Sequence, residues 1–294
     1  MATVEIITQL PVLPPRELDS NKGDFGRVLV VAGSRGMSGA AVLCGSAALR
    51  GGAGLVTVAV PEDTLPIVAA GNPCYLTAPL SNDREGKLAN VTAKVLELAQ
   101  ANDVAAVGPG LGRSVQISKS ISDLVSNIRI PLVLDADGIN ALVNQTDSLK
   151  NHSAPIILTP HPGEFARLLG CDVPTVQARR QELAVEFAAK FQVILVLKGH
   201  RTIVTDGRQV YQNQTGNPGM ATGGTGDVLT GLIAALLGQK LAPFAAAQLG
   251  VYLHGLAGDL AQEELGQISL IASDLLAFLP KAFISYCSLT QRNA

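Results

Sequence analysis

The chain is poor in residues that mark several large classes of protein. Its only cysteines in 294 residues are Cys44, Cys74, Cys171 and Cys287, and no two of them form a CxxC pair. This spacing argues against a zinc site and against a disulfide framework. Free thiols are typical of a reducing compartment, so we expect a cytoplasmic protein.

Charge is also sparse and balanced. Charged residues make up 16% of the chain, and the formal net charge is -2. Without a broad positive surface, a nucleic-acid partner is not expected. The first residues, MATVEIITQLPVLPP, have no basic segment and include Glu5, which is not typical of a secretory signal.

No apolar run is long and uninterrupted enough to predict a membrane span. Residues 241–258 contain no Asp, Glu, Lys or Arg, but Pro243, Gln248 and His254 interrupt them. We therefore expect a buried helix there and no membrane partner.

What the chain does have is an alternation of short β-branched runs with longer Ala-rich or amphipathic stretches. The runs are nearly continuous in Val, Ile and Leu, as in parallel strands that are covered on both faces. The predicted strands are 27–33, 55–61, 103–108, 131–136, 155–160 and 193–199, and the predicted helices are 38–50, 87–100, 114–127, 162–169 and 174–191. The pattern predicts an α/β fold of three layers with a mainly parallel central sheet.

The pattern changes after Lys198. TIVTDGRQVYQN predicts a hairpin that turns at Asp206 and Gly207, and the chain from 225 to about 286 is predicted to be helical. No composition shift or linker marks a boundary, so we expect one domain over 1–294.

Glycine, proline and polar residues follow the predicted strands. The segments are AGSRGMSGAA, VGPGLG, LDADGIN, LTPHPGE and LKGHRT. Turn chemistry alone explains each loop taken singly. Taken together they indicate a ligand site, because open parallel sheets bind ligands beyond the carboxyl ends of their strands.

Two of these loops are rich in glycine without matching a standard phosphate motif. GPGLG (108–112) has the wrong last spacing for a dinucleotide-binding fingerprint and follows two earlier strand–helix units. The loop from Gly33 to Ala41 lacks the Gly-Lys-Ser/Thr ending of a P-loop. Small residues here favour close approach of a ligand to the backbone.

The stretch ATGGTGD (221–227) precedes an apolar helical run. The unpaired amides of a helix that begins near Thr225 form an anion cradle, and Gly223, Gly224 and Gly226 have no Cβ to shield them. Either Thr222 or Thr225 can add a hydroxyl donor or cap the helix. Asp227 is either a stabilising helix-start carboxylate or a general base beside a transferred phosphoryl group.

Other polar residues at the strand ends leave two interpretations open. His161 is either a structural hydrogen-bonding group or part of the crevice, and Lys198 either extends into solvent or meets phosphates. Asp135 and Asp137 can orient a hydrated Mg²⁺ or simply form a helix-start turn, and Glu164 is similarly ambiguous.

The same segments carry a family resemblance. NKGDFGRVLVVAGSRGMSGAA (21–41), GPGLG, LDADGIN, LTPHPGE (158–164), VLKGHRTIV (196–204) and GNPGMATGGTGDVLTG (216–231) resemble the NAD(P)H-hydrate dehydratase family of the ribokinase-like superfamily. The match extends from about residue 21 to about residue 285. GTGD alone occurs in many ribokinase-like kinases, whereas NPGMATGGTGD together with TPHPGE is specific.

The resemblance implies a repair enzyme. Such enzymes convert the S form of hydrated NADH or NADPH back to the reduced cofactor while hydrolysing ADP or ATP, with Mg²⁺. The nucleotide phosphorylates the C6 hydroxyl, and phosphate then leaves.

The resemblance also implies roles for individual residues. Asp227 matches the catalytic acid–base position and contacts substrate, and Gly223, Gly224 and Gly226 match the anion hole. The segment Lys198, Gly199, His200, Arg201 and Thr202, with Gly226, matches the nucleotide contacts, while Ala40, Gly110 and His161 match the hydrate pocket.

Partners are implied in the same way. We expect a homo-oligomer, and an NAD(P)H-hydrate epimerase as a separate protein, because the chain is too short to include one. Two rival functions stay open: a kinase of the same superfamily that keeps a phosphorylated thiazole, pyrimidine or sugar alcohol, and a non-enzymatic nucleotide sensor.

Overall fold

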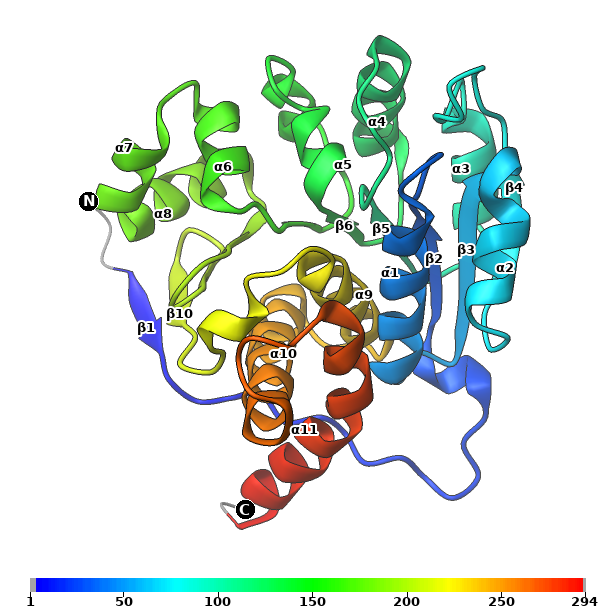
Figure 1. The fold of residues 1–294 in the computed structure, drawn as a ribbon. Coiled ribbons are helices and arrows are strands. Elements are labelled where there is room, and N and C mark those ends of the chain that lie inside the picture. Colours follow the sequence, from blue (N-terminus) through cyan, green and yellow to red (C-terminus); the bar gives the residue numbers. More distant parts are fainter. Residues whose placement is uncertain (1–3, 293–294) are drawn as a thin grey trace.

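The structure is a computed structural model and describes residues 4–292. Over this range ten strands form one sheet in the order β1-β10-β9-β8-β7-β6-β5-β2-β3-β4 (Figure 1). The strands are β1 (Glu5–Ile7), β2 (Arg27–Val31), β3 (Leu55–Pro61), β4 (Leu76–Leu80), β5 (Val104–Val107), β6 (Leu132–Leu134), β7 (Ile156–Leu158), β8 (Ile194–Leu197), β9 (Ile203–Thr205) and β10 (Gln209–Gln212).

The sheet is parallel except at β9, which pairs antiparallel with both β8 and β10. Strand β2 lies between β3 and β5. Strands β3 and β4 follow on one side of β2, and β5 and all later strands lie on the other side, so the strand order reverses at β2. The helices that follow β2 and β5, α1 (Ser38–Arg50) and α4 (Val115–Asn127), therefore lie on opposite faces of the sheet. Ligands of open α/β sheets bind in the crevice at such a switch in strand order.

Helices cover both faces of the sheet. Alternate residues of β2 lie in two separate cores: Val28 and Val30 in one, Leu29 and Val31 in the other. The first face carries α1 (Ser38–Arg50), α2 (Leu65–Gly71), α9 (Thr225–Gly238), α10 (Pro243–Leu265) and α11 (Ala272–Arg292). The second carries α3 (Thr92–Ala99), α4 (Val115–Asn127), α5 (Ala136–Asn140), α6 (Pro162–Leu169), α7 (Val173–Ala178) and α8 (Arg180–Phe191). The predicted α/β class and three layers are confirmed.

Helices α1 and α9 lie against each other in front of the sheet (Figure 1). Their contact depends on small residues, because a Cβ on Gly231 of α9 would lie 2.0 Å from the backbone oxygen of Cys44 in α1. The beginning of α9 lies beside the N-terminal half of α1, since a Cβ on Gly224 would lie 2.5 Å from Leu43 Cδ1.

The six predicted strands are confirmed, and so are the hairpin and the helices 38–50 and 162–169. Two predicted helices are wrong in extent. The segment 87–100 is helical only as α3, because Leu88 forms a β-bridge with Asn82. The segment 174–191 divides at Arg179, whose φ of -130° and ψ of 35° interrupt the helix.

Residues 241–258 fall largely within α10, so the predicted buried helix is confirmed. Among residues 4–292, no helix combines the length and the apolar character that crossing a membrane requires.

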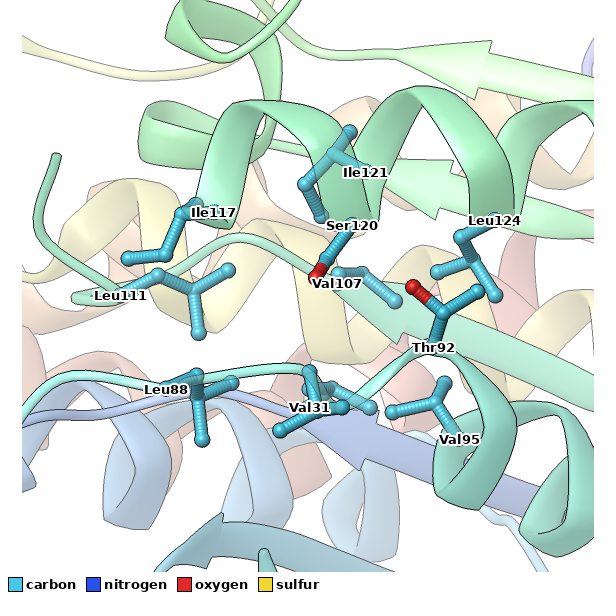
Figure 2. A pocket seen from close by; sticks show the side chains of 11 residues that line it. Val31, Leu88, Thr92, Val95, Val107, Leu111, Ile117, Ser120, Ile121 and Leu124 are labelled. Carbon is cyan, nitrogen blue, oxygen red and sulfur yellow. The ribbon is translucent and has the colours of Figure 1, made fainter. Parts of the chain in front are cut away.

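A small apolar cavity lies between α3, α4 and the sheet (Figure 2). Its volume is about 20 Å³, close to the space of one water molecule. Leu88, Val95, Leu111, Ile121 and Leu124 are among its lining residues. We interpret it as a packing gap beneath the GPGLG loop, since it is too small for an organic ligand.

Candidate active site at the start of helix α9

Helix α9 begins at Thr225, and its N-cap is Gly224, with a φ of 91°. Neither threonine caps the helix: no side chain accepts from its first amides, and the Thr225 hydroxyl donates instead to the carbonyl oxygen of Thr222 at 3.1 Å. The first amides of a helix have no acceptor within it. The glycines before α9 therefore leave backbone donors and the positive end of the helix dipole uncovered.

Asp227 lies in the first turn of this helix. Burial and the charge of Asp135 raise the pKa of Asp227 to about 7, against the opposing charge of Lys198. Asp137 and Glu164 add smaller effects in the same direction as Asp135. A carboxyl group with a pKa near neutrality can accept a proton from a hydroxyl and release it again.

Lys198, at the end of β8, reaches the same place. Its Nζ donates to Asp135 Oδ1 at 2.7 Å, and a Cβ on Gly226 would lie 3.1 Å from that Nζ. Burial alone lowers the pKa of Lys198, but the charges of Asp135 and Glu164 outweigh it and raise the pKa overall. A protonated ammonium group therefore lies over the first turn of α9.

Asp135 is only 1% exposed and both of its oxygens have partners. The Thr159 hydroxyl donates to Oδ1 at 2.8 Å, beside Lys198, and the Thr230 hydroxyl donates to Oδ2 at 2.8 Å. Asp137 Oδ2 accepts from the Gly112 amide at 2.8 Å. The structure thus engages both carboxylates in contacts within the protein, and this favours a structural role for them over metal ligation.

His161 caps helix α6. Its Nδ1 accepts from the Gly163 amide at 3.0 Å, and Glu164 Oε2 accepts from the His161 amide at 2.9 Å, which forms a capping box. Burial lowers the pKa of His161, so a neutral ring with a proton on Nε2 fits these contacts. Nε2 lies 3.4 Å from Glu164 Oε1, and the side chain of His161 is half exposed.

The loops after β2 and β5 meet at the switch in strand order. The Gly33 amide donates to the carbonyl oxygen of Pro109 at 2.8 Å, and the Ser34 hydroxyl donates to that of Gly110 at 2.8 Å. A Cβ on Gly110 would lie 2.9 Å from that of Ala40. The structure therefore brings Ala40 and Gly110 together.

The loop from Gly199 to Thr202 follows Lys198 at the exposed end of β8. Lys198 Nζ lies close to Gly226 in the first turn of α9. Among the residues that the structure describes, no hydrogen bond joins Gly199, His200, Arg201 or Thr202 to α9. The Thr202 hydroxyl donates back to the carbonyl oxygen of Gly199 at 3.0 Å, which closes the loop on itself.

Sequence reasoning missed the residues that support these groups. Arg180 donates to the carbonyl oxygens of His200 at 2.7 Å and of Leu197 and Lys198 at 3.2 Å, so it holds the loop after β8. His254 of α10 contacts the carbonyl oxygen of Thr225 through Nε2 at 2.9 Å, and burial lowers its pKa to about 4. The signal for His254 is a histidine within residues 241–258, which contain no Asp, Glu, Lys or Arg.

The chain is similar to proteins of known family. The profile of a family described as NAD(P)H-hydrate dehydratase matches residues 28–281. The bifunctional NAD(P)H-hydrate repair enzyme Nnr of Moorella thermoacetica is 48% identical over 271 residues, which are 91% of this chain and 51% of that protein. The chain thus spans about half the length of the bifunctional curated relatives that it matches.

Other relatives are matched over nearly their whole length. The ADP-dependent (S)-NAD(P)H-hydrate dehydratase of Bacillus subtilis is 37% identical over 92% of this chain and 94% of its own. The crystal structure of the ADP/ATP-dependent NAD(P)H-hydrate dehydratase from Bacillus subtilis, co-crystallised with ATP and Mg²⁺, has 34% identity and a TM-score of 0.81 over 93% of this chain and 94% of that one. The fold is ribokinase-like, as predicted. On the extent of these matches, the chain belongs to the NAD(P)H-hydrate dehydratase family.

Proposed function

We propose that the protein removes water from the S form of hydrated NADH or NADPH and couples this step to hydrolysis of ADP or ATP. The observation that carries the proposal is the start of α9, where uncovered amides, the Lys198 ammonium and the Asp227 carboxylate lie together. Donors of this kind hold a phosphoryl group, and the carboxylate is a base.

In the proposed reaction Asp227 takes the proton of the C6 hydroxyl while the hydroxyl oxygen attacks the terminal phosphorus of the nucleotide. The bond from that phosphorus to the remaining nucleotide breaks, which leaves AMP from ADP or ADP from ATP. Phosphate then leaves C6 with the C–O bonding pair, and loss of a proton from the neighbouring carbon restores the ring double bond. Phosphorylation thereby converts a poor leaving group into a good one.

The anion hole consists of the backbone at Gly223, Gly224 and Gly226. Nucleotide contacts in this proposal are Lys198, Gly199, His200, Arg201, Thr202 and Gly226. Of these, Lys198 Nζ would lie 3.1 Å from a Cβ on Gly226. Ala40, Gly110 and His161, with Asp227, line the hydrate pocket in this proposal.

Mg²⁺ enters as the complex with the nucleotide. Over residues 4–292 no cluster of three or more His, Cys, Asp or Glu side chains is placed to hold a metal. This fits Mg²⁺, which keeps several waters and binds mainly through substrate phosphates rather than in a protein cage. Bound there, it neutralises phosphate charge during transfer.

The wider setting is also proposed. It comprises a single domain over 1–294 with its core at about 21–285, a cytoplasmic location, a homo-oligomer, and a separate NAD(P)H-hydrate epimerase that supplies the S form. The bifunctional names of several relatives support the pairing of the two activities.

The test is to incubate the purified protein and Mg²⁺ with hydrated NADH or NADPH, with ADP or ATP in separate reactions. Return of the reduced-nicotinamide absorbance, with one phosphate released per cofactor restored, is the expected result. The function is rejected if phosphate is released without return of the reduced-nicotinamide absorbance, or if that absorbance does not return with either nucleotide. Accumulation of a stable phosphorylated product from an added alcohol instead identifies a kinase.

A further inference from the structure

The Lys198 ammonium lies beside the positive end of a helix dipole, which disfavours a cation. A Cβ on Gly226, in the first turn of α9, would be 3.1 Å from Nζ, so the cation faces the positive end of the α9 dipole. The Lys198 side chain is only 20% exposed, so water solvates the charge poorly. Something in the protein must hold it there.

Asp135 is the group that does so. Its Oδ1 is the one acceptor that contacts Nζ within the described part of the chain, at 2.7 Å, and a Cβ on Gly226 would lie 3.6 Å from its Oδ2. The residue stands at the end of β6, and Lys198 at the end of β8, with β7 between them in the sheet. The carboxylate therefore bridges two strand ends and the start of α9.

Thr230 fixes the second carboxylate oxygen. It is fully buried one turn along α9, and its hydroxyl lies 2.8 Å from Asp135 Oδ2 and 3.0 Å from the carbonyl oxygen of Gly226. A hydroxyl has one proton, and an ionised carboxylate is the stronger acceptor. The contact thus ties Asp135 to the same helix whose amides form the proposed anion hole.

We propose that Asp135, anchored by Thr230, is a positioning residue that holds the Lys198 ammonium over Gly226 for the terminal phosphate of the nucleotide. The inference rests on the proposed function only in taking a nucleotide as ligand. An ammonium group has three protons. With one on Asp135, the other two can meet phosphate oxygens beside the α9 amides.

The test is a double-mutant cycle on Mg·ADP affinity, measured by calorimetry without the hydrate. Lys198→Met removes the ammonium and is expected to weaken binding about tenfold or more, as for other charge-assisted hydrogen bonds. Asp135→Asn is expected to weaken binding about tenfold in the wild-type background and to cause no further loss in the Lys198→Met background. The double variant has no unpaired buried charge, so it remains measurable if Lys198→Met alone folds poorly.

Thr230 supplies the second arm. Thr230→Val keeps the shape but loses the hydroxyl and is expected to weaken Mg·ADP binding, whereas Thr230→Ser is expected to keep most of the affinity. Asp103→Asn is the matched control, because Asp103 is bonded to the Arg27 amide at the opposite ends of the strands.

Equal effects of Asp135→Asn in both backgrounds overturn the proposal, since Asp135 then acts independently of Lys198. Wild-type affinity in Asp135→Asn, or no binding of Mg·ADP by the wild-type protein, also overturns it. A wild-type protein that binds Mg·ADP with the expected coupling, but does not restore hydrated NADH, upholds this inference and rejects only the proposed function.

Discussion

Gly223 and Gly224 are adjacent in sequence, yet a Cβ would meet opposite surroundings at the two positions. On Gly224 it would lie 2.5 Å from Leu43 Cδ1, on a residue whose φ is 91°, whereas on Gly223 it would meet no atom within 4 Å. The first glycine therefore borders open space at the start of α9, and the second is required by packing and backbone conformation.

This difference separates binding from stability. Gly223→Ala places a methyl group in the proposed anion hole, so we expect weaker Mg·ADP binding with the free energy of unfolding changed by less than about 0.5 kcal/mol. Gly224→Ala should destabilise the protein by about 1–3 kcal/mol. Calorimetry and chemical denaturation of both variants check this; unchanged affinity in Gly223→Ala would remove that glycine from the site.

Asp227→Asn should trade activity for stability. The pKa of Asp227 in the folded protein is about 7, above its ordinary value of 3.8, so the wild type loses stability as pH rises from 3.8 to about 7 and this loss is complete above pH 7. At pH 8 the variant should be more stable than the wild type by about 1–3 kcal/mol, and at pH 4 the difference should vanish. Its turnover should fall by ~10²–10⁴. Denaturation at the two pH values and a turnover assay measure these effects, and equal turnover would exclude Asp227 as the base.

The same carboxyl group should govern the pH dependence of the reaction. A base must be ionised to act, so kcat/KM should increase with pH and level off above an apparent pKa of about 7. Removal of the neighbouring charge by Asp135→Asn should move this inflection to lower pH, because the charge of Asp135 raises the pKa of Asp227. A profile that is flat between pH 5 and pH 8 contradicts the assignment.

His161 combines a helix cap with a position at the crevice, and two substitutions separate these roles. His161→Asn keeps a side-chain acceptor for the Gly163 amide, whereas His161→Ala loses it and should cost about 1 kcal/mol of stability. If the imidazole contacts the hydrate, both variants should raise KM for the hydrate. A normal KM in His161→Asn would restrict His161 to capping.

The parts of this structure that sequence predicts well are those set by local composition. Continuous apolar runs such as Val28–Val31 are buried on both faces, so their strands are recognisable without knowledge of the partners. The start of α9 is recognisable for a similar reason, because its uncovered amides come from glycines that are close together in the sequence.

Long-range and marginal features were not predictable. Thr230 and Asp135 are 95 positions apart, and Arg180 donates to carbonyl oxygens 17 to 20 positions away. No local sequence pattern predicts either contact. The edge strands β1 and β4 were also not predicted. Strand β1 has only three residues, and β4 contains Pro79, which is not expected in a central strand. Tertiary pairing decides these elements.

The central claim is that the uncovered amides at the start of α9 hold the phosphate that is transferred beside Asp227. A crystal structure of the protein with Mg·ADP and NADPH tests it most directly. We predict the terminal phosphate on the backbone amides of Gly223 to Gly226, within hydrogen-bond distance of Lys198 Nζ, with the nicotinamide C6 facing Asp227. A nucleotide bound elsewhere, with these amides in contact only with water, would contradict the account.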